Sequence, residues 1–222
     1  KGCHLNYYVP EKKIETGLPP SIRNEYITFG SFNNLAKVND SVLDLWSKIL
    51  LASKNSVIRI QAKSTDKSFL MDRLFKKFEI RGVPRNRVLI VPPLGGINYL
   101  NSYNEVDICL DTFPYTGGKI TLDSIFMGLP VVTLRGEAHF TNNSASILSL
   151  INHKELIASD HDEYFRIALE LSNDTNILKA YRRDLRNSYL SDFSSNPVKI
   201  SHVLKTTVAN RLDSIRTRLD KA

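Results

Sequence analysis

The residues of this sequence best suited to chemistry are two adjacent glycines, Gly117 and Gly118, between a predicted strand and a predicted helix. The strand is the apolar run that ends at Leu110, and the helical pattern begins at about Lys119. Free N–H groups and the positive end of the helix dipole meet at such a turn, at the carboxyl edge of a parallel sheet. This combination attracts anions, so we predict a phosphate or diphosphate site. A tight turn without a ligand is the alternative, because glycine turns before helices are common.

The segment TGGKIT, residues 116–121, matches neither of the common nucleotide-binding loops. It lacks the Gly-Lys-Ser/Thr ending of a P-loop, and its adjacent glycines do not fit the spacing of the dinucleotide-binding fingerprint. Proline fixes one φ and glycine allows positive φ, which makes residues 113–118 a loop. The anion site is therefore predicted from the position of the turn and not from a motif.

Two charged residues are expected near this turn. Lys37 follows the first predicted strand, so its ammonium is expected at the same sheet edge, where it can stabilise charge developing on a diphosphate leaving group. A solvated loop lysine is the alternative. Asp123 falls in about the first turn of the helix, where a carboxylate can accept hydrogen bonds from ribose hydroxyls. The alternative for Asp123 is an acid favoured there by the helix dipole alone.

Three further polar residues are candidates for the same edge. Asn33 and Asn34 follow the first strand, where they can bind a sugar or a phosphate, or can satisfy their own backbone in a turn. His139 follows the fifth predicted strand, although a single loop histidine often has only a structural role. The remaining histidines and the two cysteines show no metal-ligand spacing, so we predict no metal site.

The elements that must position these residues alternate between strands and helices. This alternation predicts an α/β fold with a Rossmann-like, doubly wound parallel sheet and extra C-terminal helices. Gly128 and Pro130 are predicted to end the helix that follows the glycine turn. Strands are predicted at residues 26–32, 57–60, 88–91, 108–110, 131–134 and 156–158. Helices are predicted at residues 39–52, 66–78, 119–127, 142–151, 160–171, 176–190 and 197–219, with a loop and short helix at 94–105.

The domain organisation is predicted from the same pattern. Residues 1–25 contain several prolines and little periodicity, and are expected to form an extended connector. Residues 26–160 are expected to form one Rossmann-like domain, on which the helices of residues 161–222 pack. No repeat of 20 to 50 residues is present in the sequence. The chain begins at Lys1 without a methionine, so we expect it to be part of a longer protein.

Composition limits the classes of function. The chain of 222 residues is 42% hydrophobic and 24% charged, which is typical of a globular protein. Its net charge of +7 is spread among acidic residues, and no nucleic-acid-binding motif accompanies it, so nucleic acid is not the expected partner. No apolar run is long enough to predict a membrane span. Cys109 lies in an apolar strand, which favours a reduced thiol and a cytoplasmic location.

Residues 111–134, DTFPYTGGKITLDSIFMGLPVVTL, resemble the donor-site segment of the O-GlcNAc transferase family, particularly its bacterial members. The likeness continues upstream in YITFGSFNNLAKV, residues 26–38, and in the KGC and LP…RN segments near the start of the chain. Downstream it includes ELIA, residues 155–158, and the helices that follow. The resemblance therefore covers nearly the whole chain.

This resemblance implies the C-terminal, donor-binding half of a GT-B glycosyltransferase, inverting and metal-independent. Such an enzyme transfers N-acetylglucosamine from UDP-GlcNAc to Ser or Thr of an acceptor protein, with no cofactor beyond that sugar donor. Further implied partners are an N-terminal catalytic half and a tetratricopeptide region of the full-length protein. Lys37 is the implied catalytic residue. The residues expected to bind the sugar donor are Asn33, Asn34, Leu94, Tyr99, Thr116, Gly117, Gly118, Lys119, Ile120, Thr121, Asp123 and His139.

The sequence departs from the family pattern at four positions. Lys119 and Ile120 replace threonines, Tyr99 replaces a histidine, and Asn142 stands where the family has an arginine. Ile120 is expected to face the core, whereas Tyr99 can stack on a base or serve only in packing. These departures favour an alternative, a degenerate module that binds a nucleotide sugar or acts through protein contacts. A second alternative is an enzyme that uses another UDP-hexose or an asparagine acceptor.

Overall fold

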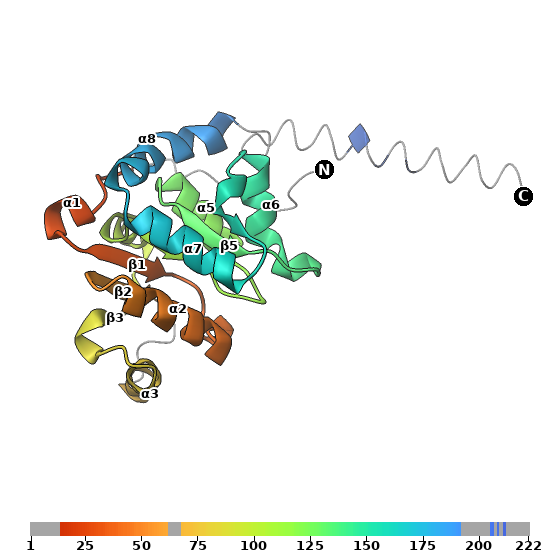
Figure 1. The fold of residues 1–222 in the computed structure, drawn as a ribbon. Coiled ribbons are helices and arrows are strands. Elements are labelled where there is room, and N and C mark those ends of the chain that lie inside the picture. Colours follow the sequence, from red (N-terminus) through yellow and green to blue (C-terminus); the bar gives the residue numbers. More distant parts are fainter. Residues whose placement is uncertain (1–13, 62–67, 192–204, 207, 209–210, 212–222) are drawn as a thin grey trace, which may run out of the picture.

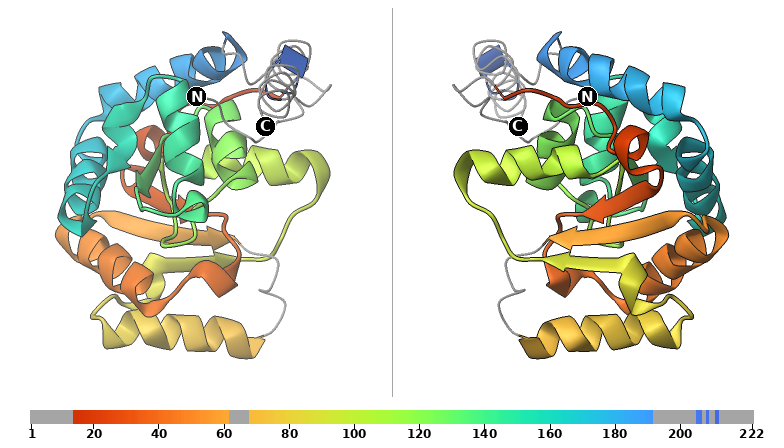
Figure 2. Two further views of the ribbon diagram at one scale, coloured as in Figure 1. Left: turned by 90° about the vertical axis from the view of Figure 1, so that its right-hand side faces the viewer. Right: turned by 90° about the vertical axis from the view of Figure 1, so that its left-hand side faces the viewer.

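The structure is a computed structural model that describes residues 14–61, 68–191, 205–206, 208 and 211. Its centre is one parallel sheet of six strands in the order β3-β2-β1-β4-β5-β6 (Figures 1 and 2). This arrangement confirms the predicted α/β class and the doubly wound topology. The strands are β1 (Ile27–Ser31), β2 (Ser56–Gln61), β3 (Val88–Val91), β4 (Ile108–Leu110), β5 (Val131–Leu134) and β6 (Ile157–Ala158).

Strand β1 lies in the middle of the sheet, between β2 and β4, and both of its faces are covered. All five of its residues are buried, which explains its nearly continuous apolar and small-residue sequence. Phe29 pairs with Ile58 of β2 on one side and with Ile108 of β4 on the other. Since every pair in the sheet is parallel, the carboxyl ends of β1, β2, β4 and β5 lie along one edge. The loops with the predicted site residues leave the sheet at this edge.

Helices cover both faces of the sheet (Figure 2). Helix α2 contacts α3 and α7, whereas α5 contacts α6 and α8. Asn39 caps α2 through a hydrogen bond from the N–H of Val42, and Asp160 caps α7 through the N–H of Glu163. The α-helices are α1 (Ser21–Asn24), α2 (Asp40–Ala52), α3 (Ser68–Ile80), α4 (Gly96–Asn101), α5 (Lys119–Phe126), α6 (Asn143–Leu150), α7 (His161–Ser172) and α8 (Thr175–Ser191).

A buried arginine of helix α8 binds the segment before β4 and the end of α5. The guanidinium of Arg182 donates to the carbonyl oxygens of Met127 (2.8 Å) and Tyr103 (3.1 Å), and also to that of Val106. Burial lowers the pKa of Arg182 to about 10, so it remains a cation at neutral pH. Gly128 ends α5 with a φ of 67°, as predicted, and a Cβ there would lie 2.8 Å from the backbone oxygen of Arg182.

The predicted elements agree with the structure apart from their ends and one short helix. Residues 14–25 contain α1, which was not predicted, and Ile14 is part of the core. Three predictions lie outside the described residues: the first 13 residues of the connector, the start of the second long helix at residue 66, and the helix over 197–219. Only four positions of the 197–219 helix are described. None of the described helices is long and apolar enough to cross a membrane.

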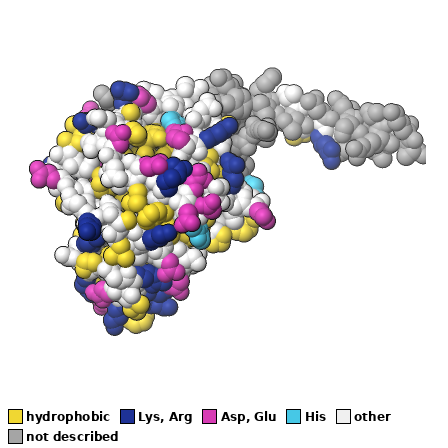
Figure 3. All heavy atoms as spheres, in the orientation of Figure 1, with side chains coloured by type: hydrophobic (Ala, Val, Ile, Leu, Met, Phe, Trp, Pro, Cys, Tyr) yellow, Lys and Arg dark blue, Asp and Glu magenta, His cyan; other side chains and the backbone are white. Residues whose placement is uncertain are grey.

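Acidic and basic side chains are mixed over the surface. On the face seen in Figure 3, dark blue and magenta side chains alternate over the helices, with apolar side chains between them. Several form exposed ion pairs, such as Arg166 with Glu163 and Glu170 on α7. The net charge of +7 is therefore not gathered into one patch on this face.

Candidate functional site

The glycine turn after β4 is held by Asp111, a buried carboxylate directly beyond the strand. Its Oδ1 accepts hydrogen bonds from the N–H of Gly117 (2.9 Å), the N–H of Thr112 (2.9 Å) and Nδ2 of Asn33 (3.1 Å). Its Oδ2 accepts from the hydroxyl of Thr133 on β5 (2.8 Å). Burial raises the pKa of Asp111, while these hydrogen bonds act in the opposite direction. One carboxylate thus ties together the loops that follow β1 and β4.

This arrangement corrects the role expected for Gly117. Its N–H donates to Asp111 and is therefore not open to an anion. The residue is a glycine because of space: a Cβ would lie 2.5 Å from the hydroxyl oxygen of Thr121 and 3.1 Å from Oδ1 of Asp111. The N–H groups that can face an anion are those of the first turn of α5, which Gly118 precedes as the N-cap.

Lys37 lies beside the turn, as its position after β1 predicted. It ends the short 3-10 helix η1 (Leu35–Lys37), and its ammonium donates to the carbonyl oxygen of Thr116 (3.0 Å). The ammonium also lies 4.1 Å from the centre of the Tyr115 ring. Partial burial lowers the pKa of Lys37, and the negative charge of Asp111 raises it to a lesser extent. Lys37 therefore supplies a half-buried cation beside Thr116, which lies two residues before the N-cap of α5.

Several other predicted residues serve the structure of the turn. The hydroxyl and N–H of Thr116 donate to the carbonyl oxygen of Phe140 (3.1 and 3.3 Å). Thr121 was expected to contact the sugar donor, but its buried hydroxyl is 2.7 Å from that of Ser144, so we withdraw this role. His139 is exposed in the 3-10 helix η4 (His139–Thr141), beside the turn through its neighbour Phe140.

The two asparagines after β1 differ in their surroundings. Asn33 is buried, and its amide holds Asp111, so its side chain supports the turn and does not face a ligand. Asn34 is exposed, and its Oδ1 accepts the N–H of Ala36, which is the backbone-satisfying alternative. Asn142, at the position of the family arginine, also bonds to nearby backbone: its amide donates to the carbonyl oxygens of Gly136 and Ala138.

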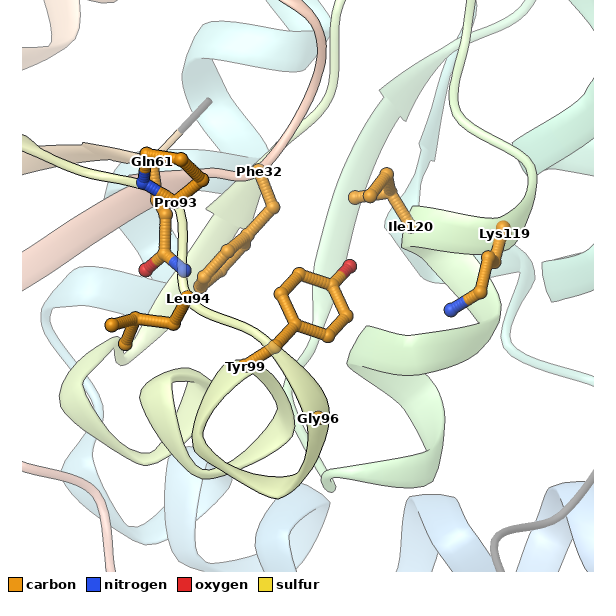
Figure 4. A pocket seen from close by; sticks show the side chains of 8 residues that line it. All are labelled: Phe32, Gln61, Pro93, Leu94, Gly96, Tyr99, Lys119 and Ile120. Carbon is orange, nitrogen blue, oxygen red and sulfur yellow. The ribbon is translucent and has the colours of Figure 1, made fainter. Parts of the chain in front are cut away.

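A pocket of about 370 Å³ opens next to the first turn of α5, between the ends of β1 and β2, the loop after β3, and α4 (Figure 4). Four of its lining residues were predicted to bind the sugar donor, including Ile120, which is half-buried and lines the pocket in addition to touching the core. The four that sequence reasoning missed come from the ends of β1 and β2, the loop after β3 and the start of α4. The lining residues are Phe32, Gln61, Pro93, Leu94, Gly96, Tyr99, Lys119 and Ile120.

Asp123 lies beneath this pocket and is closed off by two neighbours. Its Oδ2 accepts from the hydroxyl of Tyr99 (2.8 Å) and from the ammonium of Lys119 (2.7 Å), and its Oδ1 accepts from the same ammonium (2.9 Å). The Asp123 side chain is 0% exposed. It belongs to the second turn of α5 and not to the first, so the simple dipole explanation is weaker than expected.

Tyr99 packs against neighbouring aromatic residues and also lines the pocket, where a base could stack on it. Its ring lines the pocket and packs edge-on against Tyr103 at 5.4 Å, while its hydroxyl is 2.6 Å from that of Tyr103. Tyr103 in turn stacks on Phe32 at 3.7 Å. Burial raises the pKa of Tyr99, so its hydroxyl stays protonated and can donate to Asp123. The floor of the pocket is therefore aromatic, and the Tyr99 hydroxyl donates to the Asp123 carboxylate beneath it.

Gln61 is the missed residue with the clearest signal in the structure. It is the last residue of β2 and only 3% exposed. Its Oε1 accepts from Arg59 (2.6 Å), whereas its Nε2 has no hydrogen-bond partner among the described residues. A buried amide nitrogen in this state is uncommon, because buried polar groups are usually paired. Its place at a strand end was the only sequence signal for it.

No group of three or more His, Cys, Asp or Glu side chains within the described part of the chain could hold a metal ion. The charged groups of the site are instead two lysines and two carboxylates. Lys37 and Asp111 lie on the side of the turn, whereas Lys119 and Asp123 lie on the side of the pocket. The site thus offers cations and helix N–H groups on one edge next to an apolar, aromatic pocket.

Solved structures that resemble this fold are glycosyltransferases of the GT-B type. An O-GlcNAc transferase mutant from Thermobaculum terrenum superimposes with a TM-score of 0.80 at 33% identity, covering 91% of this chain and 38% of the other. TarM superimposes with a TM-score of 0.62 at 9% identity and shares the fold alone, over 91% of this chain and 37% of TarM. The fold is thus that of one Rossmann-like half of the GT-B class.

Sequence comparison narrows this class to one family. The model of glycosyl transferase family 41 matches residues 12–195, and the chain belongs to this family. A protein of Arabidopsis thaliana described as a "probable UDP-N-acetylglucosamine–peptide N-acetylglucosaminyltransferase SPINDLY" is 35% identical over 182 residues, 81% of this chain and 20% of that protein. Its counterpart from Eustoma exaltatum subsp. russellianum is 36% identical over 185 residues, 83% of this chain and 20% of the relative. The chain spans about a fifth of the length of these relatives.

Proposed function

We propose that this chain is the donor-binding half of an inverting, metal-independent glycosyltransferase that moves N-acetylglucosamine from UDP-GlcNAc to Ser or Thr of a protein. The observation that carries the proposal is the meeting of three features at one sheet edge. A half-buried lysine, Lys37, and the N-terminus of α5 lie beside a pocket of about 370 Å³. This volume is within the usual range for a small-molecule site.

Each feature suits one part of a nucleotide sugar. The aromatic floor around Tyr99 suits a base, and Asp123 suits the ribose hydroxyls if its present partners make way. The first N–H groups of α5 suit the diphosphate, because anions bind at helix N-termini. Lys37 then lies close to the phosphate that carries the sugar. The named activity of the SPINDLY relatives supports N-acetylglucosamine as the transferred group.

The proposed role of Lys37 is to stabilise the leaving group. In the transfer, a hydroxyl oxygen of the acceptor forms a bond to the anomeric carbon as the bond from that carbon to the diphosphate oxygen breaks. Negative charge then develops on the diphosphate, and a fixed ammonium in a partly desolvated site stabilises it more strongly than water does. The acceptor proton must leave to a base, and we assign this step and the binding of the acceptor to the other half of the enzyme.

Two observations favour a second candidate, a binding module without transfer. The hydroxyl of Thr121, at the start of α5, is held by Ser144, and the carboxylate suited to ribose is occupied by Lys119. Such a module would hold a nucleotide sugar weakly, or not at all, and act through protein contacts. The two candidates differ in their expected affinity for UDP.

Calorimetric titration of the chain with UDP and UDP-GlcNAc tests the proposal. We expect micromolar binding that Lys37→Ala weakens about tenfold or more, since a hydrogen bond to a charged group contributes roughly 1.5–3 kcal/mol. The matched control is Lys54→Ala, which removes an exposed lysine from the opposite edge of the sheet, in the loop before β2. No heat and no thermal shift up to millimolar UDP would overturn the UDP-sugar reading and favour the second candidate.

A further inference from the structure

The ion pair between Lys119 and Asp123 has an unusual position for an exposed lysine. Its ammonium contacts both oxygens of a carboxylate that is 0% exposed, at 2.9 and 2.7 Å, while the Lys119 side chain itself is 71% exposed. Figure 4 shows Lys119 beside Tyr99 at the pocket wall, and the Lys119 ammonium lies 5.4 Å from the centre of the Tyr99 ring. An exposed side chain thus covers the carboxylate best placed to recognise ribose.

Helix stability does not explain this pair. Lys119 is the first residue of α5, where the positive end of the helix dipole disfavours a cation. The order, with the cation four residues before the anion, is also the weaker of the two i,i+4 arrangements. A more favourable partner for a lysine at this helix N-terminus is an anion bound there. The position therefore suits a cation that changes partners.

We infer that Lys119 exchanges its partner when a nucleoside diphosphate binds. In the free protein its ammonium neutralises Asp123; in the complex it moves to the diphosphate, and a ribose hydroxyl takes its place on Asp123. Lys119 is thereby a specificity-determining residue, which makes recognition of the nucleoside depend on the presence of the diphosphate. This inference rests on the proposed function, because it concerns the same pocket.

The energetic reason is the cost of a buried, unpaired charge. Separating Lys119 from Asp123 leaves a desolvated carboxylate, and removing one partner of a buried pair is strongly unfavourable. A nucleoside brings only neutral hydroxyl donors for Asp123 and nothing for the released ammonium. A diphosphate brings that anion, so both charges remain paired. Tyr99 continues to donate to Asp123 during the exchange.

The test is a titration series with uridine, UMP and UDP on the full chain and three variants. Lys119→Met removes the charge but keeps much of the side-chain length, and Lys119→Arg keeps the charge. Lys48→Met is the matched control, because Lys48 pairs with Asp162 between α2 and α7, away from the pocket. Thermal unfolding verifies that each variant is folded. If Lys119→Met does not fold, Lys119→Thr carries the same expectation.

We expect Lys119→Met to bind uridine about tenfold more tightly, because the ammonium no longer competes with the ribose hydroxyls for Asp123. We expect it to bind UDP about tenfold more weakly, because the charged hydrogen bond from the ammonium to the diphosphate is lost. The ratio of UDP to uridine affinity then falls about a hundredfold. Lys119→Arg and Lys48→Met should keep the ratio of the natural chain. A ratio that Lys119→Met leaves unchanged, or uridine binding that it does not improve, overturns the exchange.

The same series separates this inference from the proposed function. UDP binding by the natural chain that Lys37→Ala weakens, together with an unchanged ratio in Lys119→Met, overturns the exchange alone. Absence of UDP binding in the natural chain and in every variant overturns both. The dependence on salt gives an independent readout: the UDP affinity of the natural chain should fall more steeply with ionic strength than that of Lys119→Met.

Discussion

The two sides of the candidate site are built in different ways. On the side of the turn, the polar groups bond to one another in the interior: Asp111 holds Gly117, and the Thr116 hydroxyl donates to Phe140. On the side of the pocket, the Gln61 amide nitrogen lacks a partner among the described residues, and Lys119 covers a carboxylate from the surface. The turn is a finished scaffold, whereas the pocket has groups that a ligand can engage or displace.

This difference follows the departures from the family pattern. Three of the four departures, Lys119, Ile120 and Tyr99, line the pocket, whereas the fourth, Asn142, precedes α6. The Asp111 carboxylate and the glycine that it holds belong to the segment that resembles the family. We interpret the turn as the shared support for a diphosphate and the pocket as the part in which this chain differs from its relatives.

The largest effect that would test the turn as a scaffold is expected from Asp111→Ala. The change leaves the buried N–H of Gly117, the Asn33 amide and the Thr133 hydroxyl without an acceptor, and each such group costs roughly 1–3 kcal/mol. We expect the free energy of unfolding in urea to fall by at least about 3 kcal/mol. Asp72→Ala, which breaks an exposed pair with Arg85, should change it by less than about 1 kcal/mol. Equal losses in the two variants would contradict the scaffold role.

A pair of glycine substitutions compares the two sides directly. In Gly117→Ala the new Cβ would lie 2.5 Å from the Thr121 hydroxyl oxygen, so we expect a loss of about 2 kcal/mol in the free energy of unfolding. In Gly95→Ala, in the pocket loop, the new Cβ meets nothing within 4 Å, and the change should stay within about 0.5 kcal/mol. Thermal and urea unfolding measure both. Similar effects of the two substitutions would remove the distinction between a tight turn and an open pocket loop.

The charge on the turn side should make UDP binding depend on pH. Burial lowers the pKa of Lys37 from its ordinary value of 10.5, so Lys37 loses its proton at a lower pH than a solvated lysine. The protonated form attracts the diphosphate, and UDP affinity should therefore fall as pH rises, by about tenfold between about pH 7 and about pH 10. Lys37→Arg should flatten this profile, because arginine keeps its proton in this range. A profile that is the same in both proteins would show that Lys37 does not carry the dependence.

The smallest effect is expected on the pocket side, from Gln61→Glu. A carboxylate keeps the acceptor for Arg59 but removes the amide N–H groups, which have no partner in the part of the chain that the structure describes. We expect UDP affinity to fall about threefold, because a hydrogen-bond donor to the base is lost, with the free energy of unfolding changed by less than about 1 kcal/mol. Calorimetry and urea unfolding give the two quantities. Unchanged UDP affinity would mean that Gln61 does not face the base.

Strong local patterns made most of the fold predictable from sequence. The apolar runs at residues 88–91, 108–110 and 131–134 coincide with β3, β4 and β5, and Gly128 has the positive φ expected of a helix stop. The helix α1 was missed because four residues give no measurable periodicity. The short strand β6 was predicted one residue longer than observed.

The site was predictable in its position but not in its internal bonding. The order of strand, glycine turn and helix indicated the edge at which Lys37 and α5 meet. It did not indicate that Asp111 turns inward or that the Thr121 hydroxyl bonds to Ser144, because both depend on tertiary contacts between distant loops. The pair of Lys119 and Asp123 had a signal that could have been used, since opposite charges four residues apart on a helix are neighbours.

The hydrogen bonds of Arg182 also have a consequence for how the protein is synthesised. The donor, Arg182, follows Met127 by 55 residues and Tyr103 by 79 residues along the chain. During translation, the strand and helix around the glycine turn leave the ribosome well before α8 does. We therefore expect the segments around β4 and α5 to complete their packing only after α8 has emerged from the ribosome. A nascent chain stalled before residue 182 should be loosely packed and sensitive to proteases.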